Sequence, residues 1–175
     1  GELCDNFDNR VEGVNAILAA FRRTLSVPQY SAYTSNGTWL DNEQFESVAG
    51  QTIASANWHA TASLIAAKKP NSILVDIGST TTDFVPIANG QVIARGTDDR
   101  TRLQHGELVY MGIVRTPVMA ITDTLAVEGR ATPLMAEHFA TVADAYRILG
   151  EIPDTADLHA PADGGDKSTE GSARR

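Results

Sequence analysis

The 175-residue chain has a single cysteine, Cys4, and it lacks several other features that define common protein classes. One thiol cannot form an internal disulfide or supply a cysteine-rich zinc site. No two histidines stand at metal-ligand spacing beside a carboxylate, which argues against a zinc centre. No apolar run approaches the roughly 18 to 20 residues that span a bilayer, and the N-terminal "GELCDNFDNR" is too polar and acidic for a signal peptide. We therefore expect a cytoplasmic protein with no membrane partner.

Positive charge is also scarce, because 14 Lys and Arg residues stand against 22 Asp and Glu residues, a formal net charge of -8. This balance argues against nucleic acid or an anionic membrane as the main partner. It is compatible with a small phosphorylated ligand, since backbone amides, a metal ion and a few Arg residues bind phosphate locally. The length and the 42% apolar content suit a globular domain with a hydrophobic core.

Hydrophobic periodicity and turn residues predict a mixture of helices and short strands. Helices are predicted over residues 7–26, 51–69 and 132–150, the last with Thr132 as its cap, Pro133 in its first position and Gly150 just past its end. Strands are predicted over residues 72–78, 81–87, 91–95 and 107–111, and two more on either side of an Asn36-Gly37 turn. A second turn is predicted at Asn89-Gly90. This mixture indicates an α/β or α+β fold.

The stretch "SILVDIGSTTTDFVPI", residues 72–87, places a glycine and four hydroxyl residues between two carboxylates at a strand reversal. Gly78 allows the backbone to approach a ligand closely, and the turn amides and hydroxyls can donate to phosphate oxygens. Two carboxylates would repel a bare phosphate, so they suggest a magnesium ion that bridges them to it. The predicted phosphate-binding residues are Gly78, Ser79, Thr80, Thr81 and Thr82, and the predicted Mg²⁺ ligands are Asp76 and Asp83.

An ordinary hairpin explains the same residue types equally well. Threonine is a good strand residue, and a Gly-Ser pair is common in turns. The stretch is not a Walker P-loop, because no Gly-Lys-Ser/Thr follows the glycine.

Four segments of the chain resemble one protein family. "LVDIGSTTTDFVPI" resembles the second phosphate hairpin of the acetate-kinase, sugar-kinase, Hsp70 and actin superfamily, and within it the hydantoinase-A-like group. "GELVYMGIVRTPV" (106–118), "EHFATVADAYRILG" (137–150), "ANW" (56–58) and Asp99 with Arg102-Leu103 resemble one subfamily of that group. That subfamily is linked to tetrahydromethanopterin-dependent one-carbon metabolism, and its characterised role is a synthase of methanofuran biosynthesis. The resemblance implies a ribonuclease-H-like, actin-like ATPase lobe with a mixed β-sheet flanked by helices.

The resemblance also implies a division of the chain. Residues 1–70 correspond to the end of a first lobe and the interlobe region, residues 71–153 to the phosphate-hairpin lobe, and residues 154–175 to a flexible polar tail. Family members open with another Asp-Gly hairpin and continue past the "ADG" at 162–164. We therefore expect the chain to be the central part of a longer enzyme, which leaves the activity of the fragment itself open.

The implied reaction joins an aminomethylfuran diphosphate to the phenol of a tyramine derivative and releases diphosphate. The hairpin and its Mg²⁺ would then neutralise the departing charge. Asp99, His105 and Glu107 are unranked candidates for the base or for substrate positioning. Arg102 and Arg115 would bind phosphate or a substrate carboxylate, although Arg115 as a strand bridge and Glu107 as a solvated strand residue are equally compatible with the sequence.

Two other functions fit the same sequence. One is an ATP-dependent kinase, or a hydrolase of the hydantoinase and oxoprolinase type. The other is a non-catalytic lobe that binds phosphate or a partner protein. ATP turnover separates the first of these from the synthase, and the oligomeric state stays open in all three.

Overall fold

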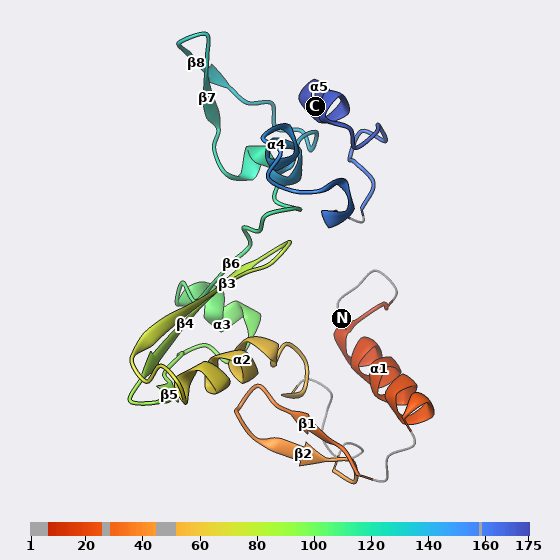
Figure 1. Ribbon diagram of the computed structural model, residues 1–175, viewed down its shortest axis with the longest axis vertical. Coiled ribbons are helices and arrows are strands. Elements are labelled where there is room, and N and C mark those ends of the chain that lie inside the picture. Colours follow the sequence, from red (N-terminus) through yellow and green to blue (C-terminus); the bar gives the residue numbers. More distant parts are fainter. Residues whose placement is uncertain (1–6, 26–28, 45–51, 158) are drawn as a thin grey trace. The chain divides into compact units, whose positions relative to one another are not determined.

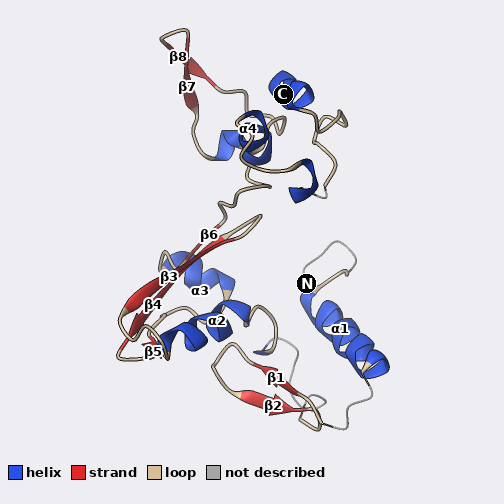
Figure 2. Ribbon diagram, viewed as in Figure 1, coloured by secondary structure: helices blue, strands red, loops and turns tan. Residues whose placement is uncertain are grey.

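The computed structural model describes residues 7–25, 29–44, 52–157 and 159–175 (Figure 1). The helices are α1 (Arg10–Thr24), α2 (Asn57–Ala66), α3 (Asp99–Gln104), α4 (Val142–Ile148) and α5 (Thr169–Arg174), with short 3-10 helices η2 (Val118–Ala120) and η3 (Asp154–Ala156). The strands are β1 (Ser31–Tyr33), β2 (Trp39–Asp41), β3 (Ser72–Ile77), β4 (Thr82–Ala88), β5 (Gln91–Val92), β6 (Leu108–Val109), β7 (Thr124–Val127) and β8 (Arg130–Pro133). Helices are interspersed with pairs and groups of strands along the chain (Figure 2), which confirms the mixed α/β character.

The chain divides into two compact units. The first contains Gly1–Val75 and Asp83–Glu107, and the second contains Asp76–Thr82 and Leu108–Arg175. The turn between β3 and β4 therefore belongs to the second unit, together with the C-terminal third of the chain. The three-part division implied by the family resemblance stays a prediction.

Short hairpins form where the sequence predicts tight turns. In the four-stranded sheet, β3, β4 and β5 are neighbours in that order and β6 pairs with β4. Asn89 and Gly90, with φ of 52° and 74°, connect β4 to β5 in the register Ile87↔Val92. Positive φ at both central residues is the geometry that an Asn-Gly pair favours. β1 and β2 pair on either side of Asn36-Gly37, as predicted, but through a five-residue loop (34–38) in which Gly37 has φ of 81° and Asn36 does not have positive φ.

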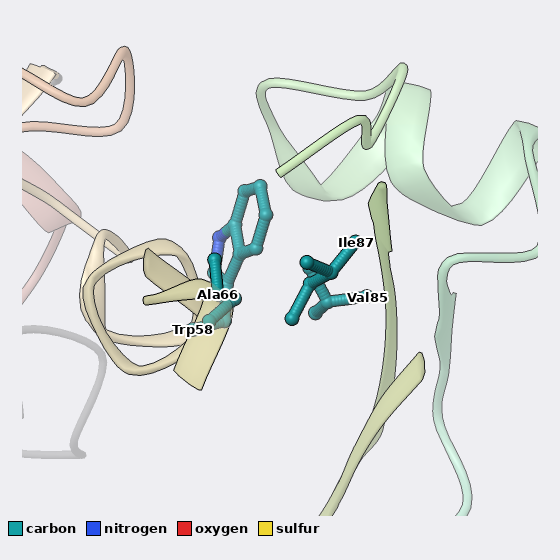
Figure 3. Close-up of a cluster of buried hydrophobic side chains, with 5 residues drawn as sticks. Trp58, Ala66, Val85 and Ile87 are labelled. Atoms are coloured by element: carbon teal, nitrogen blue, oxygen red, sulfur yellow. The ribbon is translucent and has the colours of Figure 1, made fainter. Parts of the chain in front are cut away.

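The core of the first unit lies between α2 and β4 (Figure 3). Trp58, Ala62 and Ala66 recur every four residues and so share one face of α2. Val85 and Ile87 alternate along β4 and point toward that face. All five side chains are at most 4% exposed. Trp58 is the largest side chain of this cluster, and it shares its helix face with two small alanines.

The predicted helix over residues 132–150 is wrong in its first half. Thr132 and Pro133 belong to β8, where they pair with Leu125 and Thr124 of β7. A helix of seven residues, α4, begins only after Thr141. Thr141 and Asp144 form a reciprocal capping box, and this local signal outweighs the proline at position 133. Gly150 follows the helix with φ of 73°, as predicted.

The C-terminal residues contain α5 instead of the flexible tail that their polar composition suggested. Ser168 caps α5 by accepting a hydrogen bond from the amide of Gly171. The Arg175 guanidinium lies 2.7 Å from Asp144 Oδ1 and 3.1 Å from Asp163 Oδ1, with its side chain 1% exposed. Charged hydrogen bonds, which a count of apolar residues does not detect, hold this segment in place.

None of the described helices combines the length and the apolar composition that crossing a bilayer requires.

Replacing Trp58 with alanine should lower the free energy of unfolding of the first unit by about 3–5 kcal/mol, because a large buried side chain is lost and leaves a cavity. Urea denaturation followed by circular dichroism measures this change. Trp39→Ala is the control, because Trp39 is 66% exposed and its loss should cost about 1 kcal/mol or less. Equal losses in the two variants would contradict the assignment of the core.

Candidate functional site

The turn between β3 and β4 is held by the segment that follows β6. Gly78 closes the turn by donating from its amide to the Thr81 carbonyl at 2.8 Å. The amide of Ile113 donates to the Gly78 carbonyl at 3.1 Å. The amides of Val114 and Arg115 both donate to the Ser79 carbonyl, at 3.1 and 2.9 Å. Both carbonyls at the start of the turn thus accept hydrogen bonds from one neighbouring backbone segment.

Gly112 makes this close approach possible. A Cβ at this position would lie 2.5 Å from the carbonyl carbon of Ser79 and the amide nitrogen of Thr80, a distance that backbone atoms do not tolerate. The Gly112 amide donates to Thr116 Oγ1 at 2.7 Å, and Thr82 Oγ1 donates to the Met111 carbonyl at 2.6 Å. Thr82 and Thr116 are 7% and 3% exposed, so both hydroxyls serve the fold. Thr82 therefore has a role in the turn different from those of the other three hydroxyl residues.

The turn keeps its hydrogen-bond donors available. Within the described part of the chain, the amides of Ser79, Thr80 and Thr81 donate to no acceptor. The hydroxyls of Ser79 and Thr80 lie 3.4 Å apart, and both residues are at least partly exposed. Consecutive unpaired amides in a turn form a concave site with partial positive charge, which suits an anion such as phosphate.

The segment that holds the turn is itself anchored to the start of α4. Amides of Val142 and Ala143 donate to the carbonyls of Thr116 and Val114, at 2.9 and 3.2 Å. Pro117 and Thr141 form an isolated antiparallel bridge. The motifs 106–118 and 137–150, separate in the sequence, thus form one support for the turn.

Asp144, in the first turn of α4, stabilises the start of that helix. It accepts from the Thr141 amide at 3.0 Å, from Ser172 Oγ at 2.9 Å and from Arg175. Burial by itself would raise the pKa of Asp144, but the hydrogen bonds from Arg175, Thr141 and Ser172 together hold that pKa below its ordinary value. The carboxylate is therefore charged at neutral pH and compensated on several sides.

Three of the predicted site residues meet in the first unit, around the buried guanidinium of Arg102. Arg102 is 1% exposed; its Nη1 donates to Asp83 Oδ1 at 2.5 Å and its Nη2 to the Glu107 carbonyl at 2.8 Å. Its guanidinium carbon stacks 3.8 Å from the ring centroid of Trp58. The Glu107 carboxylate accepts from the amides of Arg95 and Gly96, at 2.6 and 2.9 Å.

These contacts are those of a structural cluster, in which each buried charge has an opposite charge or a hydrogen-bond donor. The predicted ligand roles of Asp83, Arg102 and Glu107 stay predictions, and each would compete with the contacts just described. The guanidinium of Arg102 in particular is already occupied by Asp83 and the Trp58 ring.

The remaining predicted residues lie outside this cluster. Asp99 forms an ion pair with Arg10 at 2.7 Å, and His105 is the exposed C-cap of α3. Arg115 is exposed and contacts His159 through its side chain. Asp76 is partly exposed, and its carboxylate makes no contact with the other described residues. The described ranges contain no group of three or more His, Cys, Asp or Glu side chains placed to hold a metal.

Reasoning from the sequence missed the residues that shape the turn, namely Gly112, Thr116 and the Met111 carbonyl. All three lie within "GELVYMGIVRTPV", so the segment was singled out while the role of its glycine was not. A glycine in a strand-like run signals a close backbone approach, and this signal was available.

Replacing Gly112 with alanine should displace the 78–81 turn, because the new Cβ meets backbone atoms that cannot move independently. The stability loss should be about 1–3 kcal/mol, as for other overpacked sites. Amide chemical shifts of Ser79, Thr80 and Thr81 report the displacement directly. Gly129→Ala is the control: nothing lies within 4 Å of its Cβ position, and although its φ of 77° makes alanine strained there, the turn amides should not shift.

Replacing Asp144 with asparagine should destabilise the second unit at pH 7 by about 2 kcal/mol through the loss of charged hydrogen bonds. Because the folded-state pKa of Asp144 is lowered, its contribution is complete above the ordinary carboxyl pKa and is lost as the pH falls through the folded value. Urea unfolding at pH 7 and pH 3 should show a smaller difference between wild type and variant at pH 3. Asp8→Asn, at an exposed position, is the control, and an unchanged difference would contradict the prediction.

Comparison with known proteins identifies a family that the chain matches. The model of the family described as "Hydantoinase/oxoprolinase" matches residues 1–175. A protein of Methanocaldococcus jannaschii named (4-{4-[2-(gamma-L-glutamylamino)ethyl]phenoxymethyl}furan-2-yl)methanamine synthase is 37% identical over 154 residues, which are 87% of this chain and 46% of the relative. A protein of the same name from Methanococcus vannielii is 38% identical over 84 residues, or 48% of this chain and 37% of the relative.

The chain thus spans less than half the length of these curated relatives. The family match and the named relatives confirm the resemblance read from the sequence, including the similarity to the methanofuran-biosynthesis synthase. The chain belongs to the hydantoinase/oxoprolinase family.

Proposed function

We propose that the full-length protein joins an aminomethylfuran diphosphate to the phenol of a tyramine derivative and releases diphosphate, as a step of methanofuran biosynthesis in tetrahydromethanopterin-linked one-carbon metabolism. The turn Gly78–Thr82 binds the diphosphate. The observation that carries this proposal is the set of consecutive amides, Ser79 to Thr81, that have no acceptor within the described residues. The relatives support the substrates by their names. The proposed lobe is ribonuclease-H-like, in keeping with the family.

The name of the relatives describes a compound with a phenoxymethyl link to a furan that also carries a methanamine. Such an ether forms when a phenol oxygen attacks the furylmethyl carbon. The carbon–oxygen bond to diphosphate breaks, the electron pair leaves with the diphosphate, and the phenol proton goes to a base. A furylmethyl carbon tolerates positive charge, so the main task of the protein is to stabilise the leaving group.

The turn suits that task because its donors belong to a backbone that is already fixed. Amides held by the 113–115 segment need no rearrangement as negative charge grows on the departing oxygen. The hydroxyls of Ser79 and Thr80, which contact each other at 3.4 Å, add further donors beside these amides. Arg115 stands at the turn through its own amide, and its exposed side chain, which contacts His159, would exchange that contact for a phosphate.

Asp76 is the better of the two predicted Mg²⁺ ligands. Its carboxylate is uncommitted among the described residues, whereas that of Asp83 is paired with Arg102. One carboxylate with phosphate oxygens and waters is a common set for Mg²⁺, so the residues present fit the ion if the substrate completes the set. Bound there, Mg²⁺ would neutralise charge on the diphosphate.

Among the three candidates for the base, His105 is the one to test first. The Asp99 carboxylate is paired with Arg10, and both Glu107 oxygens accept from backbone amides. The His105 side chain makes no contact with the other described residues. An imidazole is a common general base, and a phenol with a pKa of about 10 in water needs such a base to remove its proton.

The second candidate function is ATP-dependent hydrolysis or phosphorylation, which the family description favours because it names hydantoinase and oxoprolinase. In that case the same turn would bind a nucleotide phosphate. The two functions differ in whether ATP is consumed.

Phosphorus NMR of the full-length protein with Mg²⁺, ATP, aminomethylfuran diphosphate and a tyramine derivative tests the proposal. Diphosphate should appear while ATP stays intact, and Asp76→Asn should slow its release by about a hundredfold, the size typical of losing one electrostatic contact to a leaving group. Asp123→Asn, an exposed change in the same unit, is the control. Formation of ADP and phosphate would instead support the second candidate function. Unchanged resonances would contradict both catalytic functions and support a lobe that binds phosphate or a partner protein without turnover.

A further inference from the structure

The second unit contains a mostly apolar cavity of about 190 Å³, open to solvent, between the β7–β8 hairpin and the segments on either side of it, and several of its lining residues, Glu137 among them, are exposed. Its walls include Val118, Met119, Leu134 and Phe139. Benzene enters an engineered apolar cavity of about 150 Å³ in another protein, so this space is large enough for one aromatic ring. Methionine side chains adapt to the faces and edges of such rings.

Two charged residues, Arg175 and Glu137, also line the cavity, and they differ in whether they already have ion-pair partners. The Arg175 guanidinium is committed to Asp144 and Asp163. The Glu137 carboxylate has no ion pair or hydrogen bond with the other described residues. An apolar cavity with one uncompensated carboxylate is complementary to an aromatic ring that carries a positive charge.

The cavity is connected to the turn by a short stretch of backbone. The amide of Arg115 donates to the Ser79 carbonyl at 2.9 Å, and Val118, three residues later, lines the cavity. Three residues of extended chain span at most about 11 Å. The bridge between Pro117 and Thr141 and the hydrogen bond from the Val118 amide to the Ala140 carbonyl hold this stretch in place.

We propose that this cavity binds the furan ring of the substrate and that Glu137 pairs with its methanamine ammonium. The ring and the charge are those in the name of the relatives' product. This assignment rests on the proposed function, since it takes the diphosphate to lie at the 78–82 turn. The same molecule would then be held at both ends, by its phosphates at the turn and by its ammonium at Glu137. Catalytic groups act on the carbon between these two ends.

Binding of furan-2-ylmethanamine to the full-length protein, followed by ligand-observed NMR, tests the cavity without requiring turnover. Glu137→Gln should weaken binding about tenfold, the size expected for one charged hydrogen bond. Leu134→Trp should abolish binding by filling the cavity. Glu128→Gln, in the β7–β8 turn away from the cavity lining, is the matched control and should bind as wild type does.

Furan-2-ylmethanol, which lacks the charge, should bind wild type at least tenfold more weakly and should not respond to Glu137→Gln. Met119→Trp replaces Leu134→Trp if that variant does not fold. Equal binding of the amine and the alcohol, or binding of the amine unchanged in both Glu137→Gln and the tryptophan variant, would overturn the assignment.

The outcome is separable from that of the synthase proposal. If ATP is consumed and no ether forms, but amine binding still depends on Glu137 and the cavity, the synthase fails and the cavity assignment stands. If diphosphate is released as expected but neither Glu137→Gln nor the tryptophan variant alters amine binding, the synthase proposal stands and the cavity assignment fails.

Discussion

The second unit depends on the shared acceptor at Ser79, whose carbonyl receives the amides of both Val114 and Arg115. This contact requires two backbones to meet without an intervening side chain, and Gly112 satisfies that requirement. It also leaves the amides of Ser79, Thr80 and Thr81 as donors without an acceptor among the described residues. Unpaired amides in a turn suit an anion, so the same packing supports the proposal that this turn binds phosphate.

Buried charge is handled in both units by the same means. In each unit an arginine that is at most 4% exposed gathers a carboxylate and a neutral oxygen, as Arg102 does with Asp83 and Arg147 does with Asp144 and Ser172. Removing one partner would leave the other charge buried and unpaired, which costs far more than the pair contributes. Asp83 and Asp144 therefore stabilise the fold through partners that are distant in the sequence. Asp76, in contrast, has no ion pair or hydrogen bond through its side chain among the described residues.

Local chemistry was predictable from the sequence, and long-range pairing was not. The Asn89-Gly90 turn follows from two residues that accept positive φ, and the 72–78 and 81–87 strands follow from their apolar alternation. The β7–β8 hairpin turns at Glu128-Gly129, a less characteristic pair, and the predicted helix over residues 132–150 began within β8. In the site, the residue types alone indicated the hydroxyl turn. The pairing of Asp83 with Arg102 joins residues 19 positions apart, so only the folded structure shows it.

The contact between Arg102 and Trp58 has a spectroscopic consequence. The chain has two tryptophans, and both belong to the first unit: Trp39 is 66% exposed and Trp58 is 4% exposed beneath a guanidinium. Aqueous quenchers therefore reach one indole and not the other, and the change in emission on unfolding arises mainly from Trp58. Tryptophan fluorescence follows the first unit alone, so the unit that contains the 78–82 turn must be followed through Tyr110 and Tyr146.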